Sequence, residues 1–217
     1  MRHKVMHKRM KIWLGVLCWI LFGILLFNVL HKTSIIYSID SVGFCLVKPV
    51  LQLKTNLLTE LTFLGDPVTV GILTIGLMLL LWRHRRIADS VWYGMLQFIG
   101  YCLVILLKYS VIRPRPTGRL VAVGGYSFPS GHTFSTIILT FTLLAILVPK
   151  CKKQYQKILV ILCGILWITI IMYSRVYLHA HYLTDVIGAF LLACGWWLLA
   201  NSQRKTFFNW LQKPIKK

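Results

Sequence analysis

The chain has 217 residues, of which 57% are apolar and only 14% are charged. Soluble domains average about 45–50% apolar and about 25% charged residues, so this composition excludes an ordinary soluble domain, a disordered chain and a disulfide-rich scaffold. The 25 Lys and Arg residues against 5 Asp and Glu residues give a net charge of +20. These cations form short clusters between long apolar runs, which indicates a polytopic membrane protein with no nucleic-acid partner.

Six apolar runs approach the length of about 20 residues that a helix needs to cross a bilayer. They cover residues 12–30, 63–82, 88–107, 133–148, 158–173 and 186–200. The last three runs are short, so we expect their helices to extend beyond these limits. The first run follows a basic start and has no small-residue cleavage site after it, which is typical of an uncleaved anchor. The sequence therefore predicts an all-α integral membrane protein, in which residues 1–217 form a single domain with six transmembrane helices.

The distribution of Lys and Arg predicts the orientation of these helices, because cytoplasmic connections carry an excess of both residues. The two terminal segments and two of the connections hold 17 of the 25 cations, and the alternate connections hold 8. We therefore expect both termini to be cytoplasmic. The connections 31–62, 108–132 and 174–185 then face the extracytoplasmic side.

The outer segment 31–62 has apolar residues at helical spacing. Ile35, Ile36, Ile39 and Val42 form one set, and a second set from Val47, Val50 and Leu51 to Leu57, Leu58 and Leu61 continues beyond a break at Pro49. This pattern predicts one or two amphipathic helices in the membrane interface. Two interpretations are open, a lid that packs on the bundle or a lipid-facing route to a functional site.

Three polar clusters lie at predicted outer helix ends, and they contain the cations Lys108, Arg115 and Arg175. A charge near hydrocarbon is unfavourable, so it normally has an anionic partner. The outer face offers only four carboxylates, Asp40, Glu60, Asp66 and Asp185, against eight cations. This imbalance indicates that an external anion is bound. Arginine suits phosphate because its planar fork binds two oxygens at once.

Two short patterns add chemistry to these cations. Ser130 precedes an apolar helix as a candidate N-cap, and Gly131 lets an anion approach the free N–H groups of the helix start. His181 and Asp185 are four residues apart and share one face of a helix. A carboxylate that accepts from one imidazole nitrogen leaves the other nitrogen available as a nucleophile or base.

The combined pattern consists of three motifs. They are Lys108 followed after six residues by Arg115-Pro116, then Pro129-Ser130-Gly131-His132, then Ser174-Arg175 followed by His181 and Asp185. This set resembles the signature of the type-2 phosphatidic acid phosphatase family, which also includes vanadium haloperoxidases and glucose-6-phosphatase-like enzymes. All three motifs are complete and in order within residues 108–185.

The resemblance implies a role for each matching residue. His181 would be the nucleophile that forms a phosphohistidine, Asp185 would orient it, and His132 would be the general acid that protonates the leaving group. The phosphate-binding residues would be Lys108, Arg115, Ser130, Gly131 and Arg175. Three cations could neutralise the phosphoryl charge without a metal, so no cofactor is expected.

The expected activity is hydrolysis of a membrane lipid phosphate or diphosphate on the extracytoplasmic face, with the bilayer and the lipid as partners. For a bacterial cell membrane the resemblance implies undecaprenyl diphosphate, phosphatidylglycerophosphate and phosphatidate as candidate substrates, and the sequence does not rank them. A small soluble phosphate ester is a further candidate, but the short loops and the amphipathic outer segment favour a lipid. The sequence does not indicate an oligomeric state.

Two other functions fit some of the same residues. A zinc hydrolase could use His132, His179, His181 and Asp185, although three nearby cations would repel a dication. A non-catalytic transporter or binder of an anionic phosphate compound could use the cations alone, but transporters usually hold substrate near the membrane midplane. His179 could be a pocket wall or an accessory acid or base. Arg113 and Arg119 could extend the anion site toward a diphosphate or contact lipid headgroups.

Overall fold

The computed structural model describes residues 2–47 and 52–211, and the regular elements in this part of the chain are all helical. The α-helices are α1 (Arg2–Leu30), α2 (Ser34–Leu46), α3 (Gln52–Phe63), α4 (Pro67–Arg83), α5 (Ile87–Val111), α6 (Gly131–Leu147), α7 (Gln154–Tyr177) and α8 (Leu183–Leu211). A short 3₁₀ turn, Val148–Lys150, follows α6. The predicted all-α class is confirmed.

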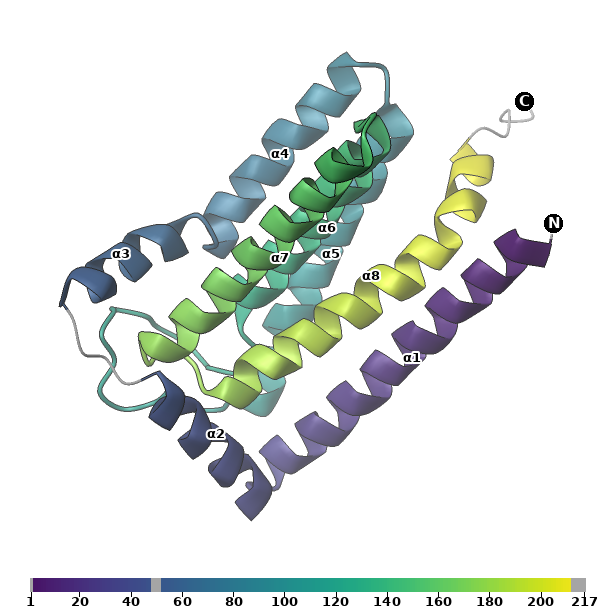
Figure 1. The fold of residues 1–217 in the computed structure, drawn as a ribbon. Helices are drawn as coiled ribbons and strands as arrows, with labels where there is room; N and C mark the ends of the chain where they lie inside the picture. Colours follow the sequence, from purple (N-terminus) through teal and green to yellow (C-terminus); the bar gives the residue numbers. More distant parts are fainter. Residues whose placement is uncertain (1, 48–51, 212–217) are drawn as a thin grey trace.

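The long helices run roughly along one direction, with the two ends of the chain at the same end of the bundle (Figure 1). Helix α6 lies centrally and contacts α4, α5, α7 and α8, and α1 packs along α8. The shorter helices α2 and α3 lie at the end opposite the termini (Figure 1). The α1–α8 pair approaches closely at Gly195, where a Cβ atom would come within 2.0 Å of the Trp19 ring.

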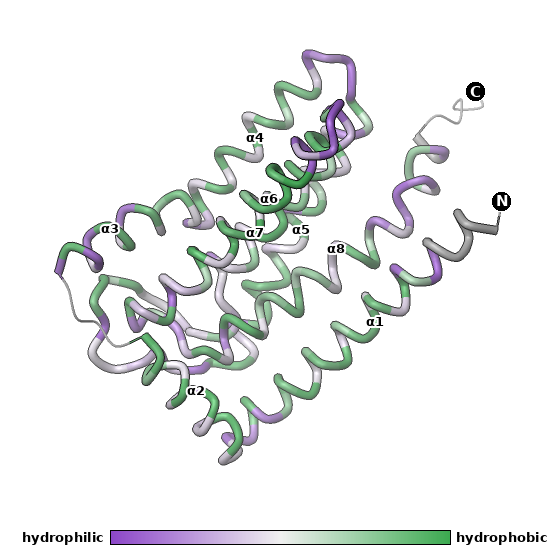
Figure 2. Tube along the Cα trace, viewed as in Figure 1, coloured by the Kyte–Doolittle hydropathy of each residue, from purple (hydrophilic) through white to green (hydrophobic). Residues whose placement is uncertain are grey.

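Within residues 2–47 and 52–211, five helices are long and apolar enough to cross a membrane, and the α3–α4 pair adds a sixth candidate if it is one span bent by 42°. Apolar residues follow these helices along most of their length, while polar residues gather at the helix ends and at the α4–α5 turn (Figure 2). Helices α7 and α8 extend beyond the predicted runs in both directions, as expected. The polytopic membrane architecture is therefore confirmed.

The predicted run 63–82 differs from the structure at its start. Phe63 ends α3, and α4 begins four residues later at Pro67. Asp66 is the N-cap of α4, since its Oδ2 accepts a hydrogen bond from Val68 N at 2.9 Å. Proline suits the first helical position because it has no N–H group to leave unpaired. Hydropathy alone does not show this break, because apolar residues continue on both sides of it.

The described part of the outer segment 31–62 holds two helices, α2 and α3, rather than one. On α2 the residues that face the bundle are Ile36, Asp40 and Gly43, which recur at helical spacing. The predicted break at Pro49, together with Val50 and Leu51, lies outside the described residues. A carboxylate on the buried face of α2 is unexpected for a purely apolar lid, and it leads directly to the functional site.

Candidate active site

The three sequence motifs meet at the end of the bundle where α2 and α3 lie (Figure 1). Lys108 and Arg175 are in the last turns of α5 and α7, and Arg115 is in the loop between α5 and α6. The remaining members are Ser130, Gly131 and His132 at the start of α6, and His181 and Asp185 at the turn into α8. A hydrogen bond from Ser130 N to Asp185 O (3.1 Å) joins the second motif to the third.

His181 lies between a carboxylate and a guanidinium. Its Nδ1 is 3.4 Å from Asp185 Oδ2, and its Nε2 is 3.1 Å from an Nη1 atom of Arg115. Because a guanidinium can only donate, its contact with Nε2 favours the tautomer that has its lone pair on Nε2 and its proton on Nδ1, toward Asp185. Nε2 is therefore the ring atom that can attack an electrophile.

Asp185 is completely buried, and both of its carboxylate oxygens accept hydrogen bonds. Oδ2 accepts from Tyr182 N at 2.9 Å, and Oδ1 accepts from Arg113 Nη1 at 2.6 Å. Arg113 thus pairs with carboxylates. This differs from both predicted alternatives, an extension of the anion site toward a diphosphate and a contact with lipid headgroups. The sequence gives no sign of this contact, because Arg113 and Asp185 are 72 positions apart.

Arg175 has the features of an anion-binding group. It is 1% exposed, and its Nη1 donates to Thr62 Oγ1 of α3 at 3.0 Å. Its Nε and Nη2 atoms are buried and have no hydrogen-bond partner among the described residues. Buried N–H groups without partners are rare and unfavourable, so this guanidinium is poised for a ligand with acceptor oxygens. Thr62, which orients it, was not identified from the sequence.

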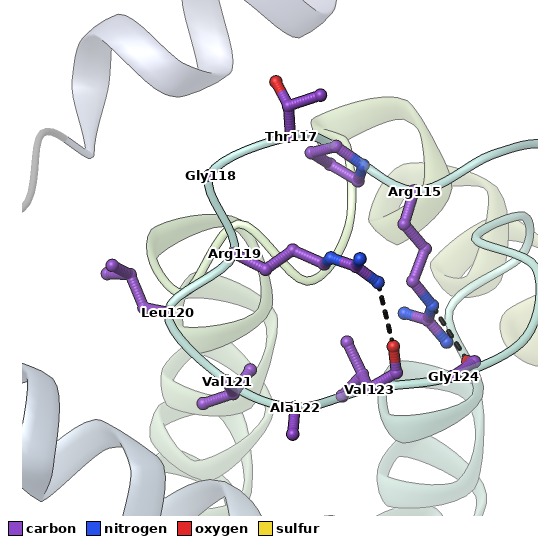
Figure 3. Close-up of a pocket in the computed structure, with 10 residues that line it drawn as sticks. Arg115, Thr117, Gly118, Arg119, Leu120, Val121, Ala122, Val123 and Gly124 are labelled. Atoms are coloured by element: carbon purple, nitrogen blue, oxygen red, sulfur yellow. Dashed lines mark hydrogen bonds between the residues drawn. The ribbon is translucent and has the colours of Figure 1, made fainter.

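The other two cations are held by backbone carbonyl groups. Lys108 Nζ donates to Tyr126 O at 2.7 Å, and Arg115 Nη1 donates to Ala180 O at 2.8 Å. Arg115 also lines a cavity of about 1070 Å³ in the loop after α5 (Figure 3). Arg119 lines the same cavity and donates to Val123 O at 3.0 Å (Figure 3). The two predicted roles of Arg119, an extension of the anion site and a contact with lipid headgroups, stay predictions.

Ser130 is the N-cap of α6, as the sequence predicts. Its Oγ accepts hydrogen bonds from Thr133 N at 3.4 Å and Thr133 Oγ1 at 3.0 Å, which leaves the Ser130 hydroxyl proton available to donate. At Gly131 a Cβ atom would meet Pro67 and Tyr101 only at 3.4 Å, an ordinary van der Waals distance. Packing therefore does not require glycine here. The missing Cβ atom instead leaves room for a ligand to approach the backbone closely.

We expect Gly131→Ala to fold normally but to lower kcat/KM by about tenfold or more, because the methyl group would obstruct an anion at the N–H groups of α6. Gly23→Ala is the matched control, since a Cβ atom at Gly23 meets nothing within 4 Å. Steady-state kinetics of the two detergent-purified variants make the comparison. Full activity in Gly131→Ala would remove this glycine from the anion site.

His132 and His179 have different surroundings. His132 Nε2 is 3.4 Å from Oδ1 of Asp66, the cap of α4, which the sequence counted among the outer anions but did not place in the site. His179 adopts a left-handed backbone with a φ of 51°, and its ring lies 4.6 Å from the Phe44 ring of α2. The His179 ring therefore packs against α2, and its two predicted roles, in a pocket wall or as an accessory acid or base, stay predictions. No cluster of three or more His, Cys, Asp or Glu side chains with metal-binding geometry occurs within residues 2–47 and 52–211.

Burial lowers the pKa of His181 well below its ordinary value of 6.5, and the charges of Lys108, Arg175 and Arg115 lower it further. A base with a lowered pKa loses its proton more readily, so the ring stays neutral as the pH falls through 6.5. With an activated aryl phosphate, whose leaving group needs no acid, we expect the rate of the first step to vary less than about twofold between about pH 7.5 and about pH 6. A decline centred near pH 6.5 in stopped-flow measurements would instead show an ordinary imidazole.

The fold and the site together define an integral membrane enzyme with a cluster of cations beside a buried histidine–carboxylate pair. Residues 89–209 match the PAP2 superfamily, and the chain belongs to this superfamily. The class predicted from the three motifs, a membrane lipid phosphatase that hydrolyses phosphoric esters, is confirmed.

The curated proteins that are similar in sequence include the following two. Phosphatidylglycerophosphatase B of Bacillus subtilis (strain 168) is 26% identical over 179 residues, which cover 79% of this chain and 86% of that protein. Lipid phosphate phosphatase delta of Arabidopsis thaliana is 27% identical over 163 residues, which cover 65% of this chain and 38% of that protein.

Two solved structures have the same fold. The crystal structure of a transmembrane PAP2-type phosphatidylglycerolphosphate phosphatase from Bacillus subtilis gives a TM-score of 0.75 at 22% identity, covering 93% of this chain and 98% of that one. The crystal structure of Aquifex aeolicus LpxE gives a TM-score of 0.56 at 23% identity, covering 73% of this chain and 93% of that one.

Proposed function

We propose that the protein hydrolyses a phosphomonoester or diphosphate of a membrane lipid on the extracytoplasmic face, through a phosphohistidine on His181 and without a metal. The observation that carries the proposal is Arg175, whose buried Nε and Nη2 atoms have no partner in the described part of the chain. Lys108 and Arg115 add positive charge near the His181 ring. A tetrahedral phosphoryl group supplies the acceptor oxygens and the negative charge that this arrangement lacks.

The reaction has two steps. The lone pair on His181 Nε2 attacks phosphorus, the bond from phosphorus to the leaving oxygen breaks, and His132 gives that oxygen a proton. His132 then takes a proton from water, whose oxygen attacks phosphorus, and the N–P bond breaks to release inorganic phosphate. Asp185 stabilises the ring while it carries positive charge, and Lys108, Arg115, Arg175, Ser130 and Gly131 hold the phosphoryl oxygens.

A lipid substrate is supported by the site's position at one end of a bundle of membrane helices and by the names of the two curated relatives. The candidates are undecaprenyl diphosphate, phosphatidylglycerophosphate and phosphatidate. The extracytoplasmic location is supported by the excess of Lys and Arg at the opposite end of the molecule.

The test is phosphate release by detergent-purified protein, with excess EDTA, from each of the three lipids and from a soluble phosphate ester. We expect release from at least one lipid, at a rate that EDTA does not change, and the ranking identifies the substrate. Loss of activity in EDTA with recovery on adding zinc would favour a metallohydrolase. Binding of lipid phosphates without release by folded protein would favour a non-catalytic binder or transporter.

A further inference from the structure

The side chain of Arg113 lies between two buried carboxylates on the side of Asp185 away from the nucleophile. Its Nη1 donates to Asp185 Oδ1 at 2.6 Å, and its Nη2 donates to Asp40 Oδ2 at 2.5 Å. The exposed side-chain fractions are 12% for Arg113, 6% for Asp40 and 0% for Asp185. One guanidinium therefore neutralises both the carboxylate that orients His181 and a carboxylate of helix α2.

Further hydrogen bonds fix Asp40 in this arrangement. Its Oδ1 accepts from Thr184 N at 3.0 Å and from Thr184 Oγ1 at 2.8 Å. The same Thr184 hydroxyl oxygen accepts from Arg113 Nη1 at 2.8 Å. Asp40, Arg113 and Thr184 thus form a closed ring of hydrogen bonds. Thr184 is the residue immediately before Asp185 in the chain. This ring connects α2 directly to the first turn of α8.

The backbone of Arg113 is also held in place. Ile112 ends α5 in a left-handed conformation with a φ of 52°, which turns the chain toward α8. Ser127 N then donates to Arg113 O at 2.9 Å. Two residues later Arg115 reaches His181 Nε2. The two arginines therefore contact opposite ends of the His181–Asp185 pair.

We propose that Arg113 and Asp40 are positioning residues that set the orientation of Asp185 and, through it, of His181. The proposal rests on the proposed function, in which His181 is the nucleophile. A buried carboxylate that loses its partner is left with an uncompensated charge and tends to rotate or to take up a proton. Either change would alter the hydrogen bond to Nδ1 of His181 and misdirect Nε2. Helix α2 is then part of the support of the active site as well as a cover on the bundle.

The test measures kcat and KM separately for phosphate release from the best lipid substrate. The proteins compared are the wild type, Asp40→Asn, Arg113→Gln, the double variant and a control, Asp89→Asn. Asp89 is a matched control because its side chain is 12% exposed and also pairs with two arginines, Arg86 at 2.8 Å and Arg204. It joins α5 to α8 at the end of the bundle away from the site. If both ion pairs only stabilised the fold, Asp40→Asn and Asp89→Asn should affect folding alike.

We expect kcat to fall about 100-fold in Arg113→Gln and about tenfold in Asp40→Asn, with KM changed by less than about threefold, because a misdirected nucleophile slows chemistry more than binding. Since Asp40 acts through Arg113, the double variant should be no slower than Arg113→Gln alone. Asp89→Asn should stay within about twofold of the wild type in kcat.

A wild-type kcat in folded Asp40→Asn would overturn the positioning role, and so would an equal loss of kcat in Asp89→Asn. Asp40→Asn leaves Arg113 paired with Asp185, so it decides the question even if Arg113→Gln fails to fold. A separate measurement on His181→Ala distinguishes a failure of the proposed function from a failure of the positioning role. Turnover in His181→Ala would overturn the proposed function, whereas an inactive His181→Ala with a normal Asp40→Asn would overturn the positioning role alone.

Discussion

We expect His181→Ala to lower phosphate release by about 10⁴-fold or more, because removing a nucleophile leaves only binding and charge stabilisation to accelerate the reaction. The structure gives the reason, since Nε2 of this buried ring presents a lone pair to the cation cluster while Nδ1 is directed at Asp185. The measurement is steady-state phosphate release from the best lipid substrate, with the folded fraction checked by gel filtration.

His179→Ala is the matched control for this substitution. It lies two residues away, and its ring packs against Phe44 rather than against Asp185. We expect it to keep most of the wild-type kcat. If His179→Ala were inactive and His181→Ala retained turnover, the roles of the two histidines would be reversed and the third motif would have been read in the wrong register.

The second large effect is expected for Asp185→Asn, which should lower kcat by about 10³–10⁴-fold with the protein still folded. An amide can donate to a ring nitrogen, so it would favour the tautomer with the proton on Nε2 of His181 and remove the attacking lone pair. KM should change far less than kcat, because Asp185 has no contact with the phosphoryl oxygens in the proposed reaction.

Glu60→Gln is a suitable control for Asp185→Asn because Glu60 is an exposed carboxylate on α3. Its kcat should equal that of the wild type. A normal kcat in Asp185→Asn would mean that the carboxylate neither orients nor stabilises His181. The hydrogen bond from Nδ1 would then be incidental, and another group would have to orient His181 and stabilise its positive charge.

The fold was predictable to the extent that it depends on local signals. Runs of apolar residues gave the membrane helices, and Lys and Arg clusters marked the connections between them. The predicted run 63–82 was wrong at its start because the cap at Asp66 and Pro67 interrupts a stretch that is apolar on both sides. One or two helices were predicted in segment 31–62, and the structure has two, but the residues of α2 that contact the bundle were not predicted.

The site was predictable where a motif gives both residue type and spacing, as for His181 with Asp185. Asp40, Thr62 and Asp66 were not assigned to it, because they reach the motifs through contacts with residues 66–144 positions away in the chain. Such contacts follow from helix packing, which hydropathy and spacing do not specify. One signal was present at Asp40, a single carboxylate within an apolar helical pattern, which is unfavourable in a membrane protein unless a cation is its partner.

The most direct test of the phosphohistidine reaction is to trap the intermediate in His132→Ala with an activated aryl phosphate. Formation of the N–P bond needs no acid with such a leaving group, whereas its hydrolysis needs the base, so the intermediate should accumulate. Alkaline quenching followed by peptide mass spectrometry should place one phosphoryl group on His181. Turnover of the wild type with phosphate on another residue, or with no phosphoenzyme in His132→Ala, would contradict the proposed reaction.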